Sequence, residues 1–379
     1  PRPRPILSPA PTPSPSPTGA TESPAPATGD TAWQAPADLR SEELPAAVPA
    51  LDVAVHDIPA SAVKALPPAP TSCASYRRPA GSDCGSRDAA AGALAAALAK
   101  TDPAQRDTAL AELDGCSHFP VGVLRGLRIE LAPRGCGDAL AGDWVKSPPA
   151  EIDGAVHDAI VGLAIGAMLS RAATEPPTMK PPYTDKAVKA FIASDVAGWI
   201  GKQAAAIEEL SRIGVKLRGY GRAVVGVEAG MAEMRFVEVM RGVPIPDEMR
   251  NDEGLREAYQ LALEEALDPR KRRGRDAALV GLGSLATLGV IRDDRVVLAR
   301  ELIGKMYGGR SIDSLDVLML PPLAPSEPTT PTDELASRLH TYYASFLIPA
   351  DTATNAGTLR ALINRGVSLP HRIALSKAE

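Results

Sequence analysis

Four cysteines are the residues whose chemistry the sequence defines most clearly. All of them lie between Cys73 and Cys136, and an even number in one region is typical of disulfides formed in an oxidising compartment. Three pairings are possible, and proximity in the sequence favours Cys73 with Cys84 and Cys116 with Cys136. A metal site formed by the cysteines and His118 is the alternative, but the spacings are wide and no C-x-x-C pair is present. We therefore expect two disulfides.

A compact basic run is the candidate partner-binding site. It consists of Arg270, Lys271, Arg272, Arg273 and Arg275. Such a run is often only the solvated start of a helix, but it can also dock an acidic protein partner or lipid headgroups.

Two further patterns could carry chemistry, and both have a structural interpretation. His157 and Asp158 are adjacent and could form a catalytic pair, although a capped or surface histidine is the more common outcome. The segment from Gly281 to Ala286 matches the dinucleotide fingerprint G-x-G-x-x-A, which requires a preceding strand and a helix that opens at the glycines. Here the preceding residues continue a helical spacing, so we expect the glycines inside a helix. We predict no catalytic residue, no cofactor and no metal ion, and a protein that is not an enzyme.

The amino-acid composition indicates a helical fold and argues against nucleic-acid binding and a transmembrane helix. Hydrophobic residues make up 45% of the 379, but aromatic residues only 4%, because most apolar positions are alanine, leucine or valine. Small apolar side chains suit closely packed helices better than a β-sandwich. The net charge of -5 gives no global basic field for nucleic acid. No apolar run approaches the roughly 18–20 residues of a transmembrane helix.

Helical periodicity is clearest between residues 243 and 306. Apolar residues recur every three or four positions, which places them on one stripe of each helix. Asp252 is a suitable N-cap, Asp268-Pro269 is expected to end or kink the first helix, and Asp293 or Asp294 can cap a third. Helices with one apolar side must bury it against a neighbour. We therefore predict a mainly α fold of antiparallel helix pairs, arranged as a bundle or a short α-solenoid.

Changes in composition divide the rest of the chain. Residues 1–50 are rich in proline, alanine, serine and threonine, and we expect a disordered or extended arm. Residues 51–146 form a disulfide-bearing helical region that begins with a short strand or an extended segment. Residues 147–306 form a helical-repeat body, and residues 307–379 form a long loop and C-terminal helices.

The segment from Pro244 to Val290 resembles the tetratricopeptide-like helical repeats of bacterial envelope proteins, and HEAT-like pairing fits almost as well. The residues that carry the resemblance are Pro246, Asp252, Tyr259, Leu263, Asp268-Pro269 and Ala277-Ala278. The resemblance implies protein–protein scaffolding.

Export is the expectation for this chain. It begins at Pro1 instead of methionine, which a removed signal segment would explain, and the cysteines favour a periplasmic or extracellular location. We expect a non-enzymatic scaffold subunit of an envelope or extracellular assembly that binds other proteins, with the proline-rich arm as a tether or a further contact. A membrane tether preceding Pro1 is compatible with this hypothesis. An enzyme with an unrecognised site and a periplasmic ligand-binding module are the alternatives.

Overall fold

The described part of the chain is mainly helical, as predicted. A computed structural model describes residues 52–76, 84–288, 290, 293–308, 335 and 338–347, and these contain helices and no strand. Residues 52–55 are therefore not part of a strand. The predicted proline-rich arm at residues 1–50 lies outside the described residues, and so do most of the predicted loop and the helix expected near residues 358–364. None of the described helices is both long and apolar enough to cross a bilayer.

Short helices and turns make up the disulfide-bearing region. Two of its helices begin at capping residues, because the side chains of Ser86 and Asp102 accept hydrogen bonds from backbone N–H groups of the turns that follow them. The elements in order are α1 (Ala60–Ala65), η2 (Thr71–Ser75), α2 (Arg87–Leu98), α3 (Pro103–Leu113), α4 (Val123–Leu131), η3 (Arg134–Cys136), α5 (Gly137–Ala141) and η4 (Gly142–Val145).

Longer helices follow, and local capping again defines where they begin. Asp153, Thr184, Asp252 and Asp293 each accept a hydrogen bond from a backbone N–H of the first turn. The elements are α6 (Gly154–Ser170), α7 (Asp185–Phe191), the π-helical turn η5 (Ile192–Val196), α8 (Ala197–Gly214), α9 (Gly219–Arg241), α10 (Asp247–Arg250), α11 (Glu253–Thr287), α12 (Asp294–Met306) and α15 (Thr341–Leu347).

Asp268-Pro269 is expected to end or kink a helix, and the first of these alternatives is wrong, because α11 continues through both residues. Pro269 lies on the exposed side of the helix, where water can reach the carbonyl group that loses its hydrogen bond. The cost of an internal proline, about 3 kcal/mol, is offset by packing of α11 against α9 on both sides of it. The turn that a tetratricopeptide-like helix pair would require between Glu253 and Thr287 is therefore not formed.

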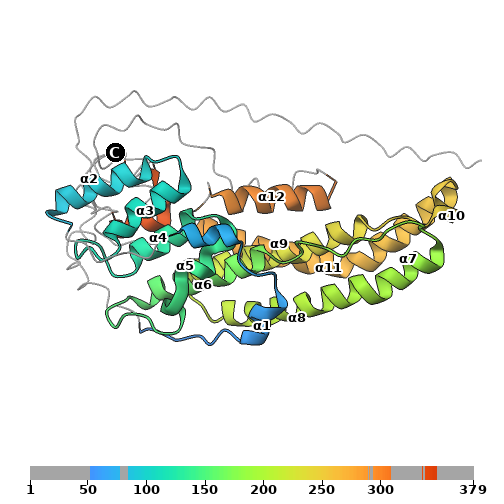
Figure 1. Cartoon of the computed structure of the whole chain (residues 1–379), viewed down its shortest axis with the longest axis horizontal. Helices are drawn as coiled ribbons and strands as arrows, with labels where there is room; N and C mark the ends of the chain where they lie inside the picture. Colours follow the sequence, from blue (N-terminus) through green and yellow to red (C-terminus); the bar gives the residue numbers. More distant parts are fainter. Residues whose placement is uncertain are drawn as a thin grey trace, which may run out of the picture. The chain divides into compact units, whose positions relative to one another are not determined.

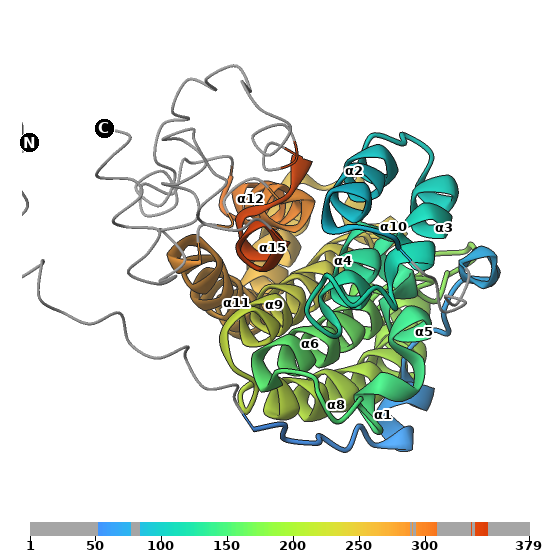
Figure 2. The same cartoon turned by 90° about the vertical axis from the view of Figure 1, so that its left-hand side faces the viewer.

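Helix α9 lies at the centre of the helical packing, between α6 and α11 (Figures 1 and 2). It runs antiparallel to α11, since Arg241 near its end pairs with Glu264 and Gly230 lies against Ala278. Against α6 the glycine Gly221 is so close that an added Cβ atom would lie 2.0 Å from a backbone oxygen. Glycines therefore permit backbone contact on two sides of α9.

Two glycines of the fingerprint-like segment provide a matched test of this packing. An added Cβ at Gly281 would lie 2.5 Å from the backbone nitrogen of Val227, whereas one at Gly283 would meet nothing within 4 Å. We expect Gly281→Ala to lower the free energy of unfolding by about 1–3 kcal/mol through overpacking. Gly283→Ala should raise it by up to about 1 kcal/mol, because alanine favours helix. Denaturant titrations followed by circular dichroism measure both, and equal effects would contradict the close approach of α9 and α11.

The predicted disulfide pairing is wrong, although the prediction of two disulfides is confirmed. The structure pairs Cys73 with Cys136 and Cys84 with Cys116, and leaves no free cysteine. Proximity in the sequence is misleading here because α2, α3 and α4 fold back and bring distant residues together. The bond between Cys73 and Cys136 fastens η2 to the turn that precedes α5.

Candidate functional site

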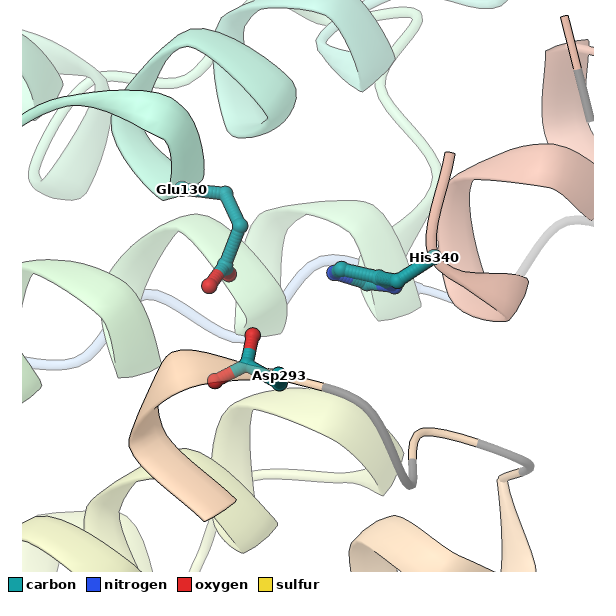
Figure 3. Close-up of side chains that lie close together, drawn as sticks. All are labelled: Glu130, Asp293 and His340. Carbon is teal, nitrogen blue, oxygen red and sulfur yellow. The ribbon is translucent and has the colours of Figure 1, made fainter. Parts of the chain in front are cut away.

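Three ionisable side chains from separate elements converge in the structure. Glu130 lies near the end of α4, Asp293 is the N-cap of α12, and His340 directly precedes α15. Their side chains point toward one another (Figure 3), and one oxygen or nitrogen atom from each lies within 4.8 Å of the other two. We refer to these three residues as the acid–histidine cluster.

Local structure fixes each member of the acid–histidine cluster. Asp293 Oδ1 accepts the backbone N–H of Arg295 at 2.6 Å, which is the helix-capping contact. His340 Nδ1 accepts the backbone N–H of Tyr342 at 3.2 Å, which directs Nε2 toward the hydroxyl group of Tyr220 at 3.3 Å. Glu130 Oε2 accepts the hydroxyl hydrogen of Tyr220 at 2.6 Å. The three side chains are therefore held by backbone and side-chain contacts.

A buried ion-pair network surrounds the acid–histidine cluster. Arg295, which is 7% exposed, donates to Glu130 at 3.0 Å and to Glu228 at 3.1 Å. Glu228 also accepts two hydrogen bonds from Arg134, at 2.6 and 2.7 Å. Buried charges require such partners, because desolvation of an unpaired ion costs several kcal/mol. The network joins α4, η3, α9 and the start of α12.

The two carboxyl groups of the cluster differ in acidity. Burial raises the pKa of Glu130 to about 7 against the opposing charge of Arg295, and a hydrogen bond with Asp293 adds to the rise. Burial alone would also raise the pKa of Asp293, but the charge of Arg295 and the hydrogen bond from its backbone N–H outweigh this effect, and the pKa is lowered. Below about pH 7 the pair therefore holds one proton, on Glu130, and above it both carboxyl groups are ionised.

Aromatic rings cover one side of the cluster. The rings of Tyr220 and Tyr342 are stacked with centroids 4.5 Å apart, and the ring of Tyr343 lies 4.9 Å from that of His340. Burial raises the pKa of Tyr220 well above its usual value, and the nearby charge of Glu130 contributes to the increase. The hydroxyl group is consequently a hydrogen-bond donor at any physiological pH. The arrangement can hold a proton or a cation among oriented donors and acceptors.

Sequence reasoning missed the acid–histidine cluster. Its members are separated by more than a hundred residues and by nearly fifty, so no motif spacing connects them. The only local signal is Glu130 itself, which is an acid near the end of the buried helix α4. Such a residue in a buried stripe indicates a partner but does not identify it.

The predicted basic run is not gathered into one patch. Three of its members are engaged within the chain, in the ion pairs Arg270–Glu233 at 2.6 Å, Lys271–Glu264 at 3.5 Å and Arg275–Asp276 at 2.7 Å. Lys271 and Arg275 also lie over the ring of Tyr307. Only Arg272 and Arg273 are classed as exposed, and Arg272 pairs with Asp268 at 2.6 Å. The run therefore divides between a packed and a solvent-facing side of α11.

His157 and Asp158 do not form a catalytic pair. His157 is fully buried, and its Nε2 atom lies 3.0 Å from the carbonyl oxygen of Trp144. The expectation of a capped or surface histidine is therefore also wrong. Asp158 instead accepts hydrogen bonds from the side chain of Arg218 at 2.5 Å and from its backbone N–H at 3.0 Å.

The two other sequence patterns with possible chemistry also have structural roles. The alternative metal site of cysteines with His118 is not formed, since all four cysteines are in disulfides and His118 contacts the carbonyl oxygen of Gly85. The glycines of the segment from Gly281 to Ala286 lie inside α11, as expected.

Comparison of the chain with family models, curated proteins and solved structures finds no match, so any function must be argued from the geometry described above.

Proposed function

We propose that this protein is a non-enzymatic, extracytoplasmic scaffold that binds a partner protein through the solvent-facing side of α11. Two disulfides are compatible with an oxidising compartment. The bundle or solenoid arrangement of its helices, and a tether formed by residues 1–50, belong to the same proposal. Binding through a helical surface is also what the resemblance to tetratricopeptide-like repeats implies.

The observation that carries the proposal is an exposed apolar face on α11. From Glu253 to Ala266 no residue of the helix is buried. Leu255 is 49% exposed, Leu261 is 72% exposed, and Val280 is 66% exposed. Leu255, Ala258, Ala262, Ala266 and Pro269 follow one another at spacings of three and four, so they form one exposed row along the helix. Leu261 lies beside this row, and Val280 lies further along it. An apolar stripe that the described residues leave uncovered is typical of a protein-binding surface.

Charge gives this face a preferred partner. Arg272 and Arg273 are the exposed cations on this side, between the leucines and Val280, and the exposed acids Glu265 and Asp276 lie beside them. A partner helix with an apolar stripe and acidic flanks would complement both features. We therefore expect an acidic amphipathic helix from another subunit to lie along the exposed face of α11.

Photo-crosslinking at defined positions tests the proposal. A crosslinking residue at Ala262 or Val280, in protein made by its native host, is expected to capture one and the same acidic protein. Charge reversal by Arg272→Glu and Arg273→Glu should reduce capture by at least about tenfold, because like charges across an interface cost several kcal/mol. Raising the salt concentration should weaken capture by the unmodified protein.

The matched control is charge reversal at Lys202 and Lys216, which are equally exposed but lie on α8 and after it. Lys202→Glu and Lys216→Glu should leave capture unchanged. Capture that is equally strong after reversal of the two arginines, or that also occurs from a crosslinker at Lys202, would contradict α11 as the binding surface.

A further inference from the structure

We propose that Glu130, Asp293 and His340 form a binding site for one divalent metal ion of the zinc class. The site is independent of partner binding by α11. Its ligand atoms lie within 4.8 Å of one another and come from three elements that are remote in sequence (Figure 3). A metal ion at this position would link α4 and the starts of α12 and α15.

The ligand types select the class of metal. Imidazole nitrogen favours zinc and related first-row ions, whereas magnesium and calcium prefer oxygen ligands alone. Zinc bonds to histidine and carboxylate atoms are about 2.0–2.2 Å long, which corresponds to ligand atoms about 3.5 Å apart in a tetrahedron. The side chains would need to close by about 1 Å, which rotation of a glutamate and an aspartate can supply.

Local charge is consistent with a cation at the cluster. Three carboxylates, those of Glu130, Glu228 and Asp293, face the guanidinium groups of Arg134 and Arg295 within ion-pair distance. A bound cation would displace the proton from Glu130, and with all three acids ionised one negative charge is in excess. Arg295 also competes for Glu130 and Asp293, so we expect affinity in the micromolar range and not the much tighter binding of a structural zinc finger.

Coordination requires a change at His340. The backbone N–H of Tyr342 donates to Nδ1 at 3.2 Å, so the neutral ring carries its hydrogen on Nε2, the atom that faces the hydroxyl group of Tyr220. A metal ion at Nε2 moves that hydrogen to Nδ1 and breaks the contact with the Tyr342 N–H. The amide resonance of Tyr342 therefore reports on coordination.

A second observation supports a ligand at the cluster. Tyr343 is 1% exposed, and its hydroxyl group has no hydrogen-bond partner among the described residues. Its hydroxyl group lies against Gly126, one helical turn before Glu130, and its ring centroid lies 4.9 Å from that of His340. A buried hydroxyl group without a partner is costly. A water molecule on a bound metal ion would give it one.

Calorimetric titration of the full, oxidised chain with zinc chloride tests the proposal, and cobalt(II) absorption reports on the coordination geometry. We expect one ion per chain, a shifted Tyr342 amide resonance and a melting temperature that rises with zinc concentration. Asp293→Asn and His340→Gln should each weaken zinc binding at least about tenfold. Asparagine at position 293 preserves the helix cap, so this variant separates loss of a ligand from loss of folding.

His118→Gln is the matched control, because His118 is exposed and remote from the cluster. It should bind zinc as the unmodified chain does. Absence of binding at millimolar zinc, several weak ions per chain, or unchanged binding in both ligand variants would overturn the site. None of these results affects the proposal that α11 binds a partner protein. Conversely, if α11 captured no partner, the proposed metal site would be unaffected.

Discussion

Replacement of Arg295 by methionine is expected to lower the free energy of unfolding by about 3–5 kcal/mol, because it leaves buried carboxylates without their cation. Arg295 is buried and contacts Glu130, Glu228 and Asp293 at distances from 3.0 to 3.5 Å. Methionine replaces the aliphatic stem of the side chain and omits the guanidinium group, so the space left by that group adds to the effect of the lost charge. Denaturant titrations at neutral pH measure the change.

Arg272→Met is the matched control for this substitution. Arg272 also forms an ion pair, with Asp268 at 2.6 Å, but its side chain is 67% exposed. Exposed pairs contribute about 0–1 kcal/mol, so the control should change stability little. A second variant, Arg295→Met with Glu228→Gln, should recover part of the loss because it removes one of the orphaned charges. Equal effects of the two arginine substitutions would show that burial does not determine the strength of the network.

Local chemistry was readable from the sequence. Asp252 is expected to begin a helix, and its side chain caps α11. Asp293, one of two residues expected to cap a later helix, caps α12. A cap is formed by a residue and the three that follow it, so a short window of sequence contains all that determines it. The mainly α class follows from the same local signals and from apolar periodicity.

Features that depend on distant residues could not be read in the same way. The effect of Pro269 depends on which side of α11 faces α9. Proline usually ends a helix, but the helix can continue when the segments before and after the proline both pack against a neighbour. The acid–histidine cluster requires that α4 and the starts of α12 and α15 meet. In the basic run, Arg270 pairs with Glu233 of α9, and Lys271 and Arg275 lie over the ring of Tyr307. These contacts with distant residues separate the packed members of the run from Arg272 and Arg273.

Disulfide connectivity also depends on contacts between distant residues, and removal of one disulfide is expected to have a large effect on stability. Replacing Cys73 and Cys136 by serine is expected to lower the free energy of unfolding by about 4 kcal/mol in the chain-entropy model, since the bond closes a loop between residues separated by 63 positions. Both sulfur positions are buried, so the serine hydroxyl groups add a further desolvation cost. Thermal and denaturant unfolding of the oxidised variant measure the loss.

Removal of the other bond, by Cys84→Ser and Cys116→Ser, is the internal comparison. Its residues are separated by 32 positions, so the model gives a loss smaller by about 0.6 kcal/mol, and the half-buried Cys84 lowers the desolvation cost. The expected order of stability is therefore unmodified chain, then the variant without Cys84–Cys116, then the variant without Cys73–Cys136. The reverse order would mean that the bond between η2 and the start of α5 constrains the unfolded chain less than its span implies. Peptide mapping of the oxidised chain by mass spectrometry should also recover the pairs Cys73–Cys136 and Cys84–Cys116. Pairing of nearest neighbours in the sequence would instead close two short loops and would not link η2 to the start of α5.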